Sequence, residues 1–333
     1  MIASFGEVLL RLSPPGFERL AQARTLSMHF GGAEANVAVF LAQLGHSSRF
    51  LTCLPDNALG QACRGELARW GVDVSGSRLS GSRLGLYFCE KGAGPRSGRV
   101  TYDRAHSAMA SVTPENFDWE RLLDGAVWFH FSGITPALGE GPAAAVEAAC
   151  RAARAEGAVV SCDLNYRSAL WPEDKAKERL LPLLGLTDVL IANEHHIADV
   201  LGFPPASEMK DTAEKAFSMA RRLRETFGFR QVAVTHRETL SAGCSRFGAF
   251  LSGKGEHASQ IRTIEVVDRI GGGDAFAAGL IHGLLAGWSE DRSVEFAAAA
   301  SCLKLTVEGD FFIASEEEIA DFMRGDGYGR IRR

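Results

Sequence analysis

Residues 266–287, VVDRIGGGDAFAAGLIHGLLAG, form the stretch that decides the fold of this chain. Three consecutive glycines, Gly271, Gly272 and Gly273, precede a lone carboxylate, Asp274. Beyond Asp274 the stretch contains no charged residue and no proline, and nearly every side chain is small or apolar. This composition predicts a helix that is buried on most of its faces.

Glycines directly before a helix let backbone N–H groups point toward one place, where the helix dipole adds partial positive charge. Such a turn binds anions, and we expect its glycines to have no room for a side chain. Asp274 would then lie beside a phosphate-sized anion site, kept ionised by the dipole. A kinase needs that pair: amides for the charge on the transferred phosphoryl group, and a base for the acceptor hydroxyl. The alternative is a glycine-rich turn in which Asp274 only caps the helix.

The composition is that of an ordinary globular protein, with 333 residues, 46% hydrophobic and 23% charged, and a net charge of −5. This length fits two domains, or one large α/β domain with an insertion. The mildly acidic balance offers no general attraction to nucleic acid or to anionic membranes. No apolar run reaches the length of a membrane span, and the N-terminus lacks a basic leader, so we expect no signal peptide. Seven scattered cysteines without a CxxC pair indicate reduced thiols and a cytoplasmic protein.

Hydrophobic patterning predicts an alternation of strands and helices along most of the chain. Strands are expected over residues 2–10, 47–54, 127–132, 159–164, 189–192 and 231–235. Helices are expected over residues 34–44, 58–70, 142–156, 175–184, 195–201 and 212–227. This alternation implies an α/β fold with a mostly parallel sheet and helices on both faces. Ligands bind such sheets beyond the carboxyl ends of the strands. The residues expected there are Gly32, Ser132, Asn165, Asn193, Thr235 and Asp274.

Two segments, residues 11–30 and 78–106, interrupt this alternation. The second contains two expected strands, 84–90 and 99–104, whose connection is rich in glycine, proline and serine, which predicts a hairpin with a long loop. Together the two segments predict a small β lid inserted in the main domain. Exposed lid strands offer edges for pairing, so we expect a homo-oligomer that assembles through the lid.

Residues 31–45, GGAEANVAVFLAQLG, form a second helix opened by glycines, near the other end of the chain. With DRIGGGDAFAAG at 268–279, this stretch resembles the two signatures of the ribokinase-like (PfkB) family of sugar kinases. The usual form of the second signature is DxxGAGD, so Gly272 replaces an alanine. Other stretches look most like 2-keto-3-deoxygluconate kinases: GLYFCEKGAGPR (85–96), VTYDRAHSA (100–108), FHFSGITPAL (129–138) and DLNYRSALW (163–171).

The resemblance covers residues 1–333 and implies one ribokinase-like, three-layer α/β/α domain. A dinucleotide-binding fold is disfavoured because no GxGxxG follows the first strand, and a Walker A loop does not occur. Asp274 would be the base, with Gly271, Gly272 and Gly273 around the transferred phosphate. The implied substrate contacts are Gly32, Asn36, Tyr87, Tyr102, Arg104, Arg167, Asp274 and Asp310. The implied nucleotide contacts are Asn165, Asn193, Thr235, Arg237, Glu238, Gly271, Gly273 and Lys304.

ATP would be the phosphoryl donor, and Mg²⁺ would be held through phosphates and water rather than by a protein ligand. Many relatives carry Asn-x-x-Glu at the position of residues 193–196, linked to magnesium through water. This chain has His196 at the glutamate position, with Glu194 as an alternative carboxylate. A zinc site at His195 and His196 lacks a third ligand.

The predicted substrate depends on two arginines. Tyr102 and Arg104 are two apart on an expected strand, so both face one side, and Arg167 follows another strand. Because a guanidinium binds a carboxylate bidentately, two arginines suit a sugar acid better than a neutral sugar. Alternatively, Arg104 is a surface arginine beside Asp103 and Arg167 forms a salt bridge, which would fit a fructokinase or ribokinase. A third alternative is a non-catalytic sugar-binding regulator, which would be expected to lose the glycines or Asp274.

Overall fold

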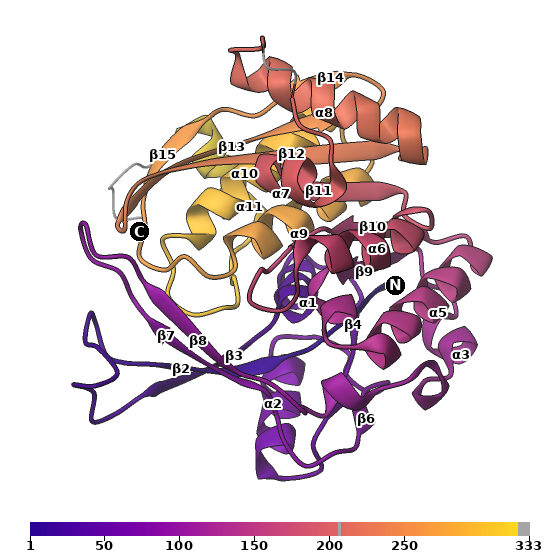
Figure 1. The fold of residues 1–333 in the computed structure, drawn as a ribbon, viewed down its shortest axis with the longest axis vertical. Coiled ribbons are helices and arrows are strands. Elements are labelled where there is room, and N and C mark those ends of the chain that lie inside the picture. The colour runs from indigo at the N-terminus through magenta and orange to yellow at the C-terminus, as the bar shows by residue number, and fades with distance from the viewer. Residues whose placement is uncertain (206–207, 326–333) are drawn as a thin grey trace.

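The computed structural model describes residues 1–205 and 208–325, so residues 206–207 and 326–333 of the predicted domain lie outside it. A nine-stranded sheet runs through the molecule (Figure 1). Its spatial order is β14 (Glu256–Ala258), β13 (Cys244–Ser252), β12 (Gln231–Ser241), β11 (Val189–Asn193), β10 (Val159–Asp163), β9 (Trp128–Ser132), β1 (Ile2–Phe5) and β4 (Ser48–Leu51), with β15 (Arg262–Glu265) paired to β13.

The strands from β4 to β12 are parallel to their neighbours, and β13, β14 and β15 are antiparallel. The parallel strands are nearly continuous apolar runs, as in the buried sequence VLIA at 189–192, because helices cover both faces. The predicted mostly parallel sheet is therefore confirmed. The strand expected over 231–235 is too short, because β12 runs past the end of β11 to Ser241 and pairs there with β13.

Alternate residues of the strands face two separate cores. On β9, Phe129 and Phe131 belong to the first core and Trp128 to the second. The first core is covered by α3 (Trp119–Leu123), α5 (Glu140–Ala155), α6 (Glu173–Leu184) and α8 (Thr212–Phe227). The second is covered by α1 (Ala33–Gln43), α9 (Gly272–Leu285), α10 (Glu290–Lys304) and α11 (Glu316–Arg324). One core on each side of the sheet gives the predicted three-layer α/β/α architecture.

Shorter helices complete the layers. α2 (Ala58–Arg69) lies over a third, smaller core. α4 (Ile134–Ala137) follows β9, and α7 (Glu194–His196) follows β11 and continues as a π-helical turn over Ile197–Leu201. Within the described residues, no helix combines the length and the apolar character that a membrane span requires.

A second, four-stranded sheet has the order β3 (Ser27–Gly31), β2 (Leu9–Ser13), β7 (Leu86–Glu90) and β8 (Arg99–Asp103). We call it the small sheet. Its strands come from the neighbourhood of the two segments predicted as a β lid, and Figure 1 shows it extending away from the main sheet. β7 and β8 pair antiparallel, as expected of a hairpin.

The single strand expected over residues 2–10 is wrong. The chain leaves the main sheet after β1 and enters the small sheet at β2. Between them, Gly6 lies against the buried Glu34 carboxylate, which a β-carbon at Gly6 would overlap. The hydrophobic pattern does not reveal this break, because every residue over 2–10 is buried. The strand expected over 47–54 likewise divides into β4 and β5 (Cys53–Leu54), which pairs with β6 (Arg78–Leu79).

The helix predicted after Asp274 is α9, and its buried faces are confirmed. Gly279 allows α10 to approach closely, since a β-carbon at Gly279 would lie 2.9 Å from the Ala297 Cα. α1 packs against another side of α9. The two helices opened by glycines are therefore neighbours.

Candidate active site

A cavity of about 380 Å³ lies between the small sheet and the carboxyl ends of the parallel strands. Most of the predicted site residues line it: Gly32, Asn36, Tyr87, Tyr102, Arg104, Asn165, Arg167, Asn193, Thr235, Arg237, Gly271, Gly272, Gly273, Asp274 and Asp310. Two predicted residues, Glu238 and Lys304, do not. The strands and helices thus bring together residues from one end of the chain to the other.

Within the glycine turn, Gly271–Gly273, the requirement for glycine is strongest at the first residue. Gly271 has φ +84°, and a β-carbon there would lie 2.5 Å from the Asp310 carbonyl oxygen. At Gly272 the nearest atom to a β-carbon would be the movable Leu305 Cδ2, at 2.9 Å, and at Gly273 no atom lies within 4 Å. The expectation that all three glycines lack room for a side chain is therefore wrong for Gly273. The backbone constraint falls on Gly271.

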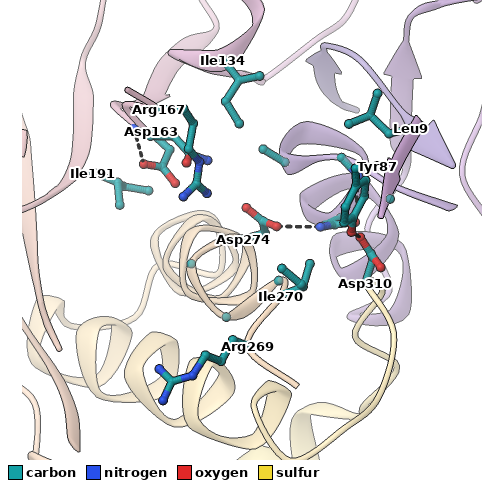
Figure 2. Close-up of a pocket in the computed structure, with 18 of the residues that line it drawn as sticks. Leu9, Tyr87, Ile134, Asp163, Arg167, Ile191, Arg269, Ile270, Asp274 and Asp310 are labelled. Carbon is teal, nitrogen blue, oxygen red and sulfur yellow. Dashed lines mark hydrogen bonds between the residues drawn. The ribbon is translucent and has the colours of Figure 1, made fainter. Parts of the chain in front are cut away.

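Asp274 lies in the first turn of α9 and faces the cavity (Figure 2). Its Oδ2 accepts a hydrogen bond of 2.6 Å from the side-chain amide of Asn36. Burial raises the pKa of Asp274 to about 6, although the Asn36 hydrogen bond and the Arg167 charge both lower it. Asp274 is therefore still mostly ionised near neutral pH, as expected, although burial brings its pKa closer to neutrality than that of a free carboxyl. A pKa near neutrality suits a general base.

A second carboxylate, Asp163, faces the same cavity from the end of β10, and sequence reasoning missed it. Burial and the neighbouring Asp274 charge raise the pKa of Asp163 to about 7, while Arg167 lowers it. Its Oδ1 accepts from the Asn165 N–H at 3.1 Å, and Asn165 has φ +34°. The position of Asp163 at the carboxyl end of a strand, within CDLNYR, was the available signal.

The side of the cavity formed by the small sheet carries two tyrosines and an arginine. Tyr87 is buried and its hydroxyl donates to Asp310 Oδ1, whereas Tyr102 is half-exposed. Arg104 Cζ lies 5.5 Å from the centre of the Tyr102 ring. Its Nε donates to Glu7 Oε2 at 2.8 Å. Glu7 also lines the cavity and was missed, because its partner is 97 residues away in the sequence.

Arg104 is therefore not a surface arginine beside Asp103. Asp103 instead pairs with Arg83 at 2.8 Å, while Arg104 is buried and faces the cavity. The ion pair with Glu7 occupies Nε and Nη2 of Arg104. The remaining guanidinium nitrogen, Nη1, is the group that could bind a ligand anion.

Three arginines, Arg167, Arg237 and Arg269, line another part of the cavity. Burial lowers the pKa of Arg237, and the nearby positive charges of Arg269 and Arg167 lower it further. Arg167 and Arg237 form no ion pair with a carboxylate among the described residues. Asp163 and Asp274 lie within electrostatic reach of Arg167 without forming a close ion pair, so this concentration of positive charge suits an anionic ligand.

His196 lines the cavity near this positive region. Burial, with the charges of Arg167 and His195, lowers the pKa of His196 to about 4, so the imidazole is neutral at physiological pH. Glu194, the alternative carboxylate, instead accepts from His236 Nδ1 at 3.1 Å. Among the described residues, no group of three or more His, Cys, Asp or Glu side chains could hold a metal ion.

The two predicted residues outside the cavity have other partners. Lys304 is fully buried, and its Nζ donates to the carbonyls of Val307 (3.0 Å) and Gly309 (2.8 Å). Glu238 is exposed and pairs with Arg246 at 3.0 Å. Successive side chains of a strand point to opposite sides, so Glu238 faces away from the cavity that its neighbour on β12 lines.

The buried carboxylate of Glu34, in the first turn of α1, connects this helix to the segment that follows β9. Its Oε1 accepts from the Ser132 N–H (3.0 Å), the Ser132 hydroxyl (2.7 Å) and the Thr135 hydroxyl (2.9 Å). Burial raises the pKa of Glu34 to about 7 against the effect of these hydrogen bonds. The network ties α1 to the end of β9 and so fixes the helix that carries Asn36.

Comparison with known proteins identifies the family. A family model described as pfkB family carbohydrate kinase matches residues 1–316. The chain is similar to a crystal structure of 2-dehydro-3-deoxygluconokinase from Thermotoga maritima, with 45% identity, a TM-score of 0.94, and coverage of 97% of this chain and 98% of that one. It is 34% identical over 328 residues to a 2-dehydro-3-deoxygalactonokinase of Haloferax volcanii, covering 98% of both chains.

A putative ribokinase II from E. coli, solved in complex with ATP and Mg²⁺, shares the fold at 21% identity and a TM-score of 0.81, over 97% of this chain and 99% of that one. The match over nearly the whole length, together with the cavity at the two glycine-opened helices, identifies the relationship. The chain belongs to the pfkB family of carbohydrate kinases.

Proposed function

We propose that this protein is an ATP-dependent sugar-acid kinase that phosphorylates 2-keto-3-deoxygluconate at its terminal hydroxyl, giving 2-keto-3-deoxy-6-phosphogluconate. The observation that carries the proposal is the position of Asp274 between two chemically different ends of one cavity. Figure 2 shows Asp163 and Arg167 on one side of Asp274, and Tyr87 and Asp310 on the other. The relatives from Thermotoga and Haloferax, named for 3-deoxy sugar acids, support the same substrate class.

In this reaction Asp274 accepts the proton of the terminal hydroxyl as the sugar oxygen bonds to the γ-phosphorus of ATP. The bond from that phosphorus to the bridging oxygen breaks, and ADP leaves with the electron pair. The backbone N–H groups of the glycine turn stabilise the charge on the transferred group. Asn36 orients the Asp274 carboxylate through the 2.6 Å hydrogen bond.

The substrate carboxylate is proposed to bind Arg104 and Arg167, with Tyr87, Tyr102, Gly32 and Asp310 contacting the rest of the sugar acid. Arg167 is exposed and lies within electrostatic reach of Asp163 and Asp274. Among the described residues it forms no close ion pair with either, so its guanidinium is available for bidentate binding. Arg104 would contribute its Nη1, since Glu7 holds the other nitrogens.

ATP is proposed to bind on the side of the cavity lined by Arg237 and Arg269. A positive φ at Gly271 and open space at Gly273 leave the turn accessible to a phosphate, so the residues present fit this donor. Asn165, Asn193 and Thr235 line the same cavity and offer hydrogen bonds. Mg²⁺, when bound through phosphates and water, would neutralise phosphate charge during transfer.

A second cavity of about 970 Å³ adjoins the first at Arg269 and Ile270. Its wall includes the apolar side chains of Leu240, Val266 and Val267. We propose that the adenosine part of ATP extends into it, because apolar walls suit a purine ring.

The small sheet is proposed to act as a lid that excludes water during transfer.

The small sheet is also the proposed site of homo-oligomerisation, since its outer strand β8 is exposed along its whole length and Met28 on β3 is 58% exposed. Size-exclusion chromatography with light scattering, comparing the wild type with Met28→Glu, tests this: dimers that dissociate in the variant support it, and a monomeric wild type contradicts it.

An ADP-release assay across a panel of sugars tests the proposed function. We expect turnover with 2-keto-3-deoxygluconate, or with its galactonate-derived epimer, and little with fructose, ribose or no sugar. Equal turnover with fructose would favour a neutral-sugar kinase. Sugar-acid binding by calorimetry without ADP release would favour a non-catalytic regulator.

A further inference from the structure

A fully buried arginine outside the cavity connects the small sheet to the segments around the glycine turn. Arg11, on β2, has Nη2 2.8 Å from Asp268 Oδ2 and Nη1 3.2 Å from Asp310 Oδ2. Its Nε donates to Ser13 Oγ at 2.8 Å. Asp268 precedes the glycine turn, and Asp310 lies beyond α10, so one guanidinium bridges three distant parts of the chain.

The buried charges around Arg11 are balanced. Lys304, also fully buried, lies within electrostatic reach of Asp268 and Asp310, which gives two cations and two carboxylates. The Lys304 ammonium also holds the loop that leads to Asp310, through the carbonyls of Val307 and Gly309. A buried charge is tolerated only with partners. Altering one member therefore disturbs the positions of the others.

One side of this cluster reaches the sugar end of the cavity. Asp310 Oδ1 accepts the hydroxyl of Tyr87, while Arg11 holds Oδ2 of the same carboxylate. Tyr87 lines the cavity, with its ring centre 5.9 Å from that of Tyr102. The direction of the Tyr87 hydroxyl is thus fixed by a carboxylate that Arg11 orients.

The other side reaches the glycine turn. Asp268 Oδ1 accepts the Ile270 N–H at 3.2 Å, and its Oδ2 accepts the Gly309 N–H at 3.1 Å. The Asp310 carbonyl oxygen packs so closely against Gly271 that a β-carbon there would lie 2.5 Å from it. Asp310 therefore touches Tyr87 with its side chain and Gly271 with its main chain.

We propose that Arg11 is a positioning residue, which sets the Tyr87 hydroxyl and the glycine turn relative to each other through Asp310 and Asp268. The inference rests on the proposed kinase function, since it assigns Tyr87 to the sugar and the turn to the transferred phosphate. If β2 moved within the small sheet, Arg11 would move with it. The contacts of Arg11 with Asp268 and Asp310 would then transmit this movement to the glycine turn.

Arg11→Lys tests the proposal, because lysine keeps the charge but is a single point donor that does not bridge two carboxylates. We expect the sugar KM to rise and kcat to fall, each by about tenfold, the factor that loss of one charge-assisted hydrogen bond gives. Arg49→Lys is the matched control. Arg49 lies away from the cavity and forms an ion pair with Asp73 at 2.7 Å. The kinetic constants of Arg49→Lys should therefore differ from those of the wild type by less than about twofold.

A double-mutant cycle separates positioning from general destabilisation. Tyr87→Phe removes the hydroxyl that Asp310 accepts, so its effect on sugar KM should be largely absent in an Arg11→Lys background. Tyr102→Phe makes the same chemical change on the same sheet, without a hydrogen bond to Asp310. Its effect should add to that of Arg11→Lys.

If Arg11→Lys does not fold, Asp268→Asn replaces it. Asparagine is nearly the same size as aspartate, and Asp268 has no hydrogen bond to Tyr87. A change in the sugar KM together with kcat would therefore show that Asp268 acts on Tyr87 through Arg11 and Asp310. Additive effects of Tyr87→Phe, a change in only one of the two constants, or a lowered melting temperature with unchanged kinetics would each overturn the proposal. Absence of sugar-dependent turnover in the wild type would instead refute the proposed function.

Discussion

α1 and α9 look alike in the sequence, because glycines open both helices, but the structure gives the two openings different roles. Gly32, before α1, has an extended backbone with φ −179°, and a β-carbon there would overlap the Glu7 carbonyl. Gly271, before α9, has φ +84°. Gly32 is required because another segment packs against it. Gly271 is required by its own backbone conformation as well.

The difference extends to the first turns of the two helices. The Gly32 N–H donates to the Asn36 side-chain oxygen at 3.3 Å, and the Asn36 amide in turn donates to Asp274. The start of α1 is therefore closed by its own side chain and serves to hold the Asp274 carboxylate. The start of α9 remains open at Gly273. Glycines before a helix predict an anion site only when nothing else occupies the turn.

The largest effect is expected from Asp274→Asn, which removes the proposed base at the open helix but keeps its size. Turnover should fall by about 10²–10⁴, with sugar binding measured by calorimetry retained. Asp291→Asn is the matched control, since Asp291 also lies in the first turn of a helix, α10, but is exposed. More than about a tenth of wild-type turnover in Asp274→Asn would exclude general-base catalysis by this residue.

Gly271→Ala should be the next most damaging change. A left-handed conformation costs a non-glycine residue about 1–2 kcal/mol, and the β-carbon would press on the Asp310 carbonyl. We expect a lower melting temperature and reduced turnover. Gly273→Ala should keep the melting temperature of the wild type, because no atom lies within 4 Å of its β-carbon. Equal melting temperatures for the two variants would contradict the assigned difference within the turn.

Arg104→Ala and Arg167→Ala should each raise the KM for the sugar acid by about ten- to hundredfold, with a smaller effect on ATP. The two variants should differ in melting temperature. Arg104→Ala leaves Glu7 buried without its cation and should destabilise the protein, whereas Arg167 is exposed. Arg83→Ala, which breaks the pair with Asp103, serves as the control. A sugar-acid KM unchanged in both variants would remove the case for a carboxylate substrate.

The smallest effect is expected from Asp163→Asn on stability as a function of pH. The pKa of Asp163 is raised to about 7 in the folded protein, so the unfolded chain loses this proton first as pH rises. Ionised Asp163 therefore reduces stability increasingly between about pH 4 and pH 7. Asp163→Asn should raise the melting temperature at pH 8 more than at pH 5. An equal or smaller gain at pH 8 would show that its folded pKa is not raised.

Local patterns in the sequence predicted the elements and the cavity-lining residues that follow strands, because strand and helix periodicity are short-range properties. They did not predict the break between β1 and β2, where burial continues through a change of sheet. They also missed Arg11, whose partner Asp310 is 299 positions away. Lys304 was expected at the nucleotide from the family resemblance, but its ammonium donates to backbone carbonyls instead.

The most direct test of the account is phosphorus NMR of the wild type with ATP and 2-keto-3-deoxygluconate, in parallel with fructose. We expect a new phosphomonoester signal with the sugar acid, matched by ADP, and none with fructose over the same time. This would show that the cavity transfers the phosphoryl group to an acceptor that carries a carboxylate. Inorganic phosphate in place of the ester, or the ester formed equally well with fructose, would contradict it.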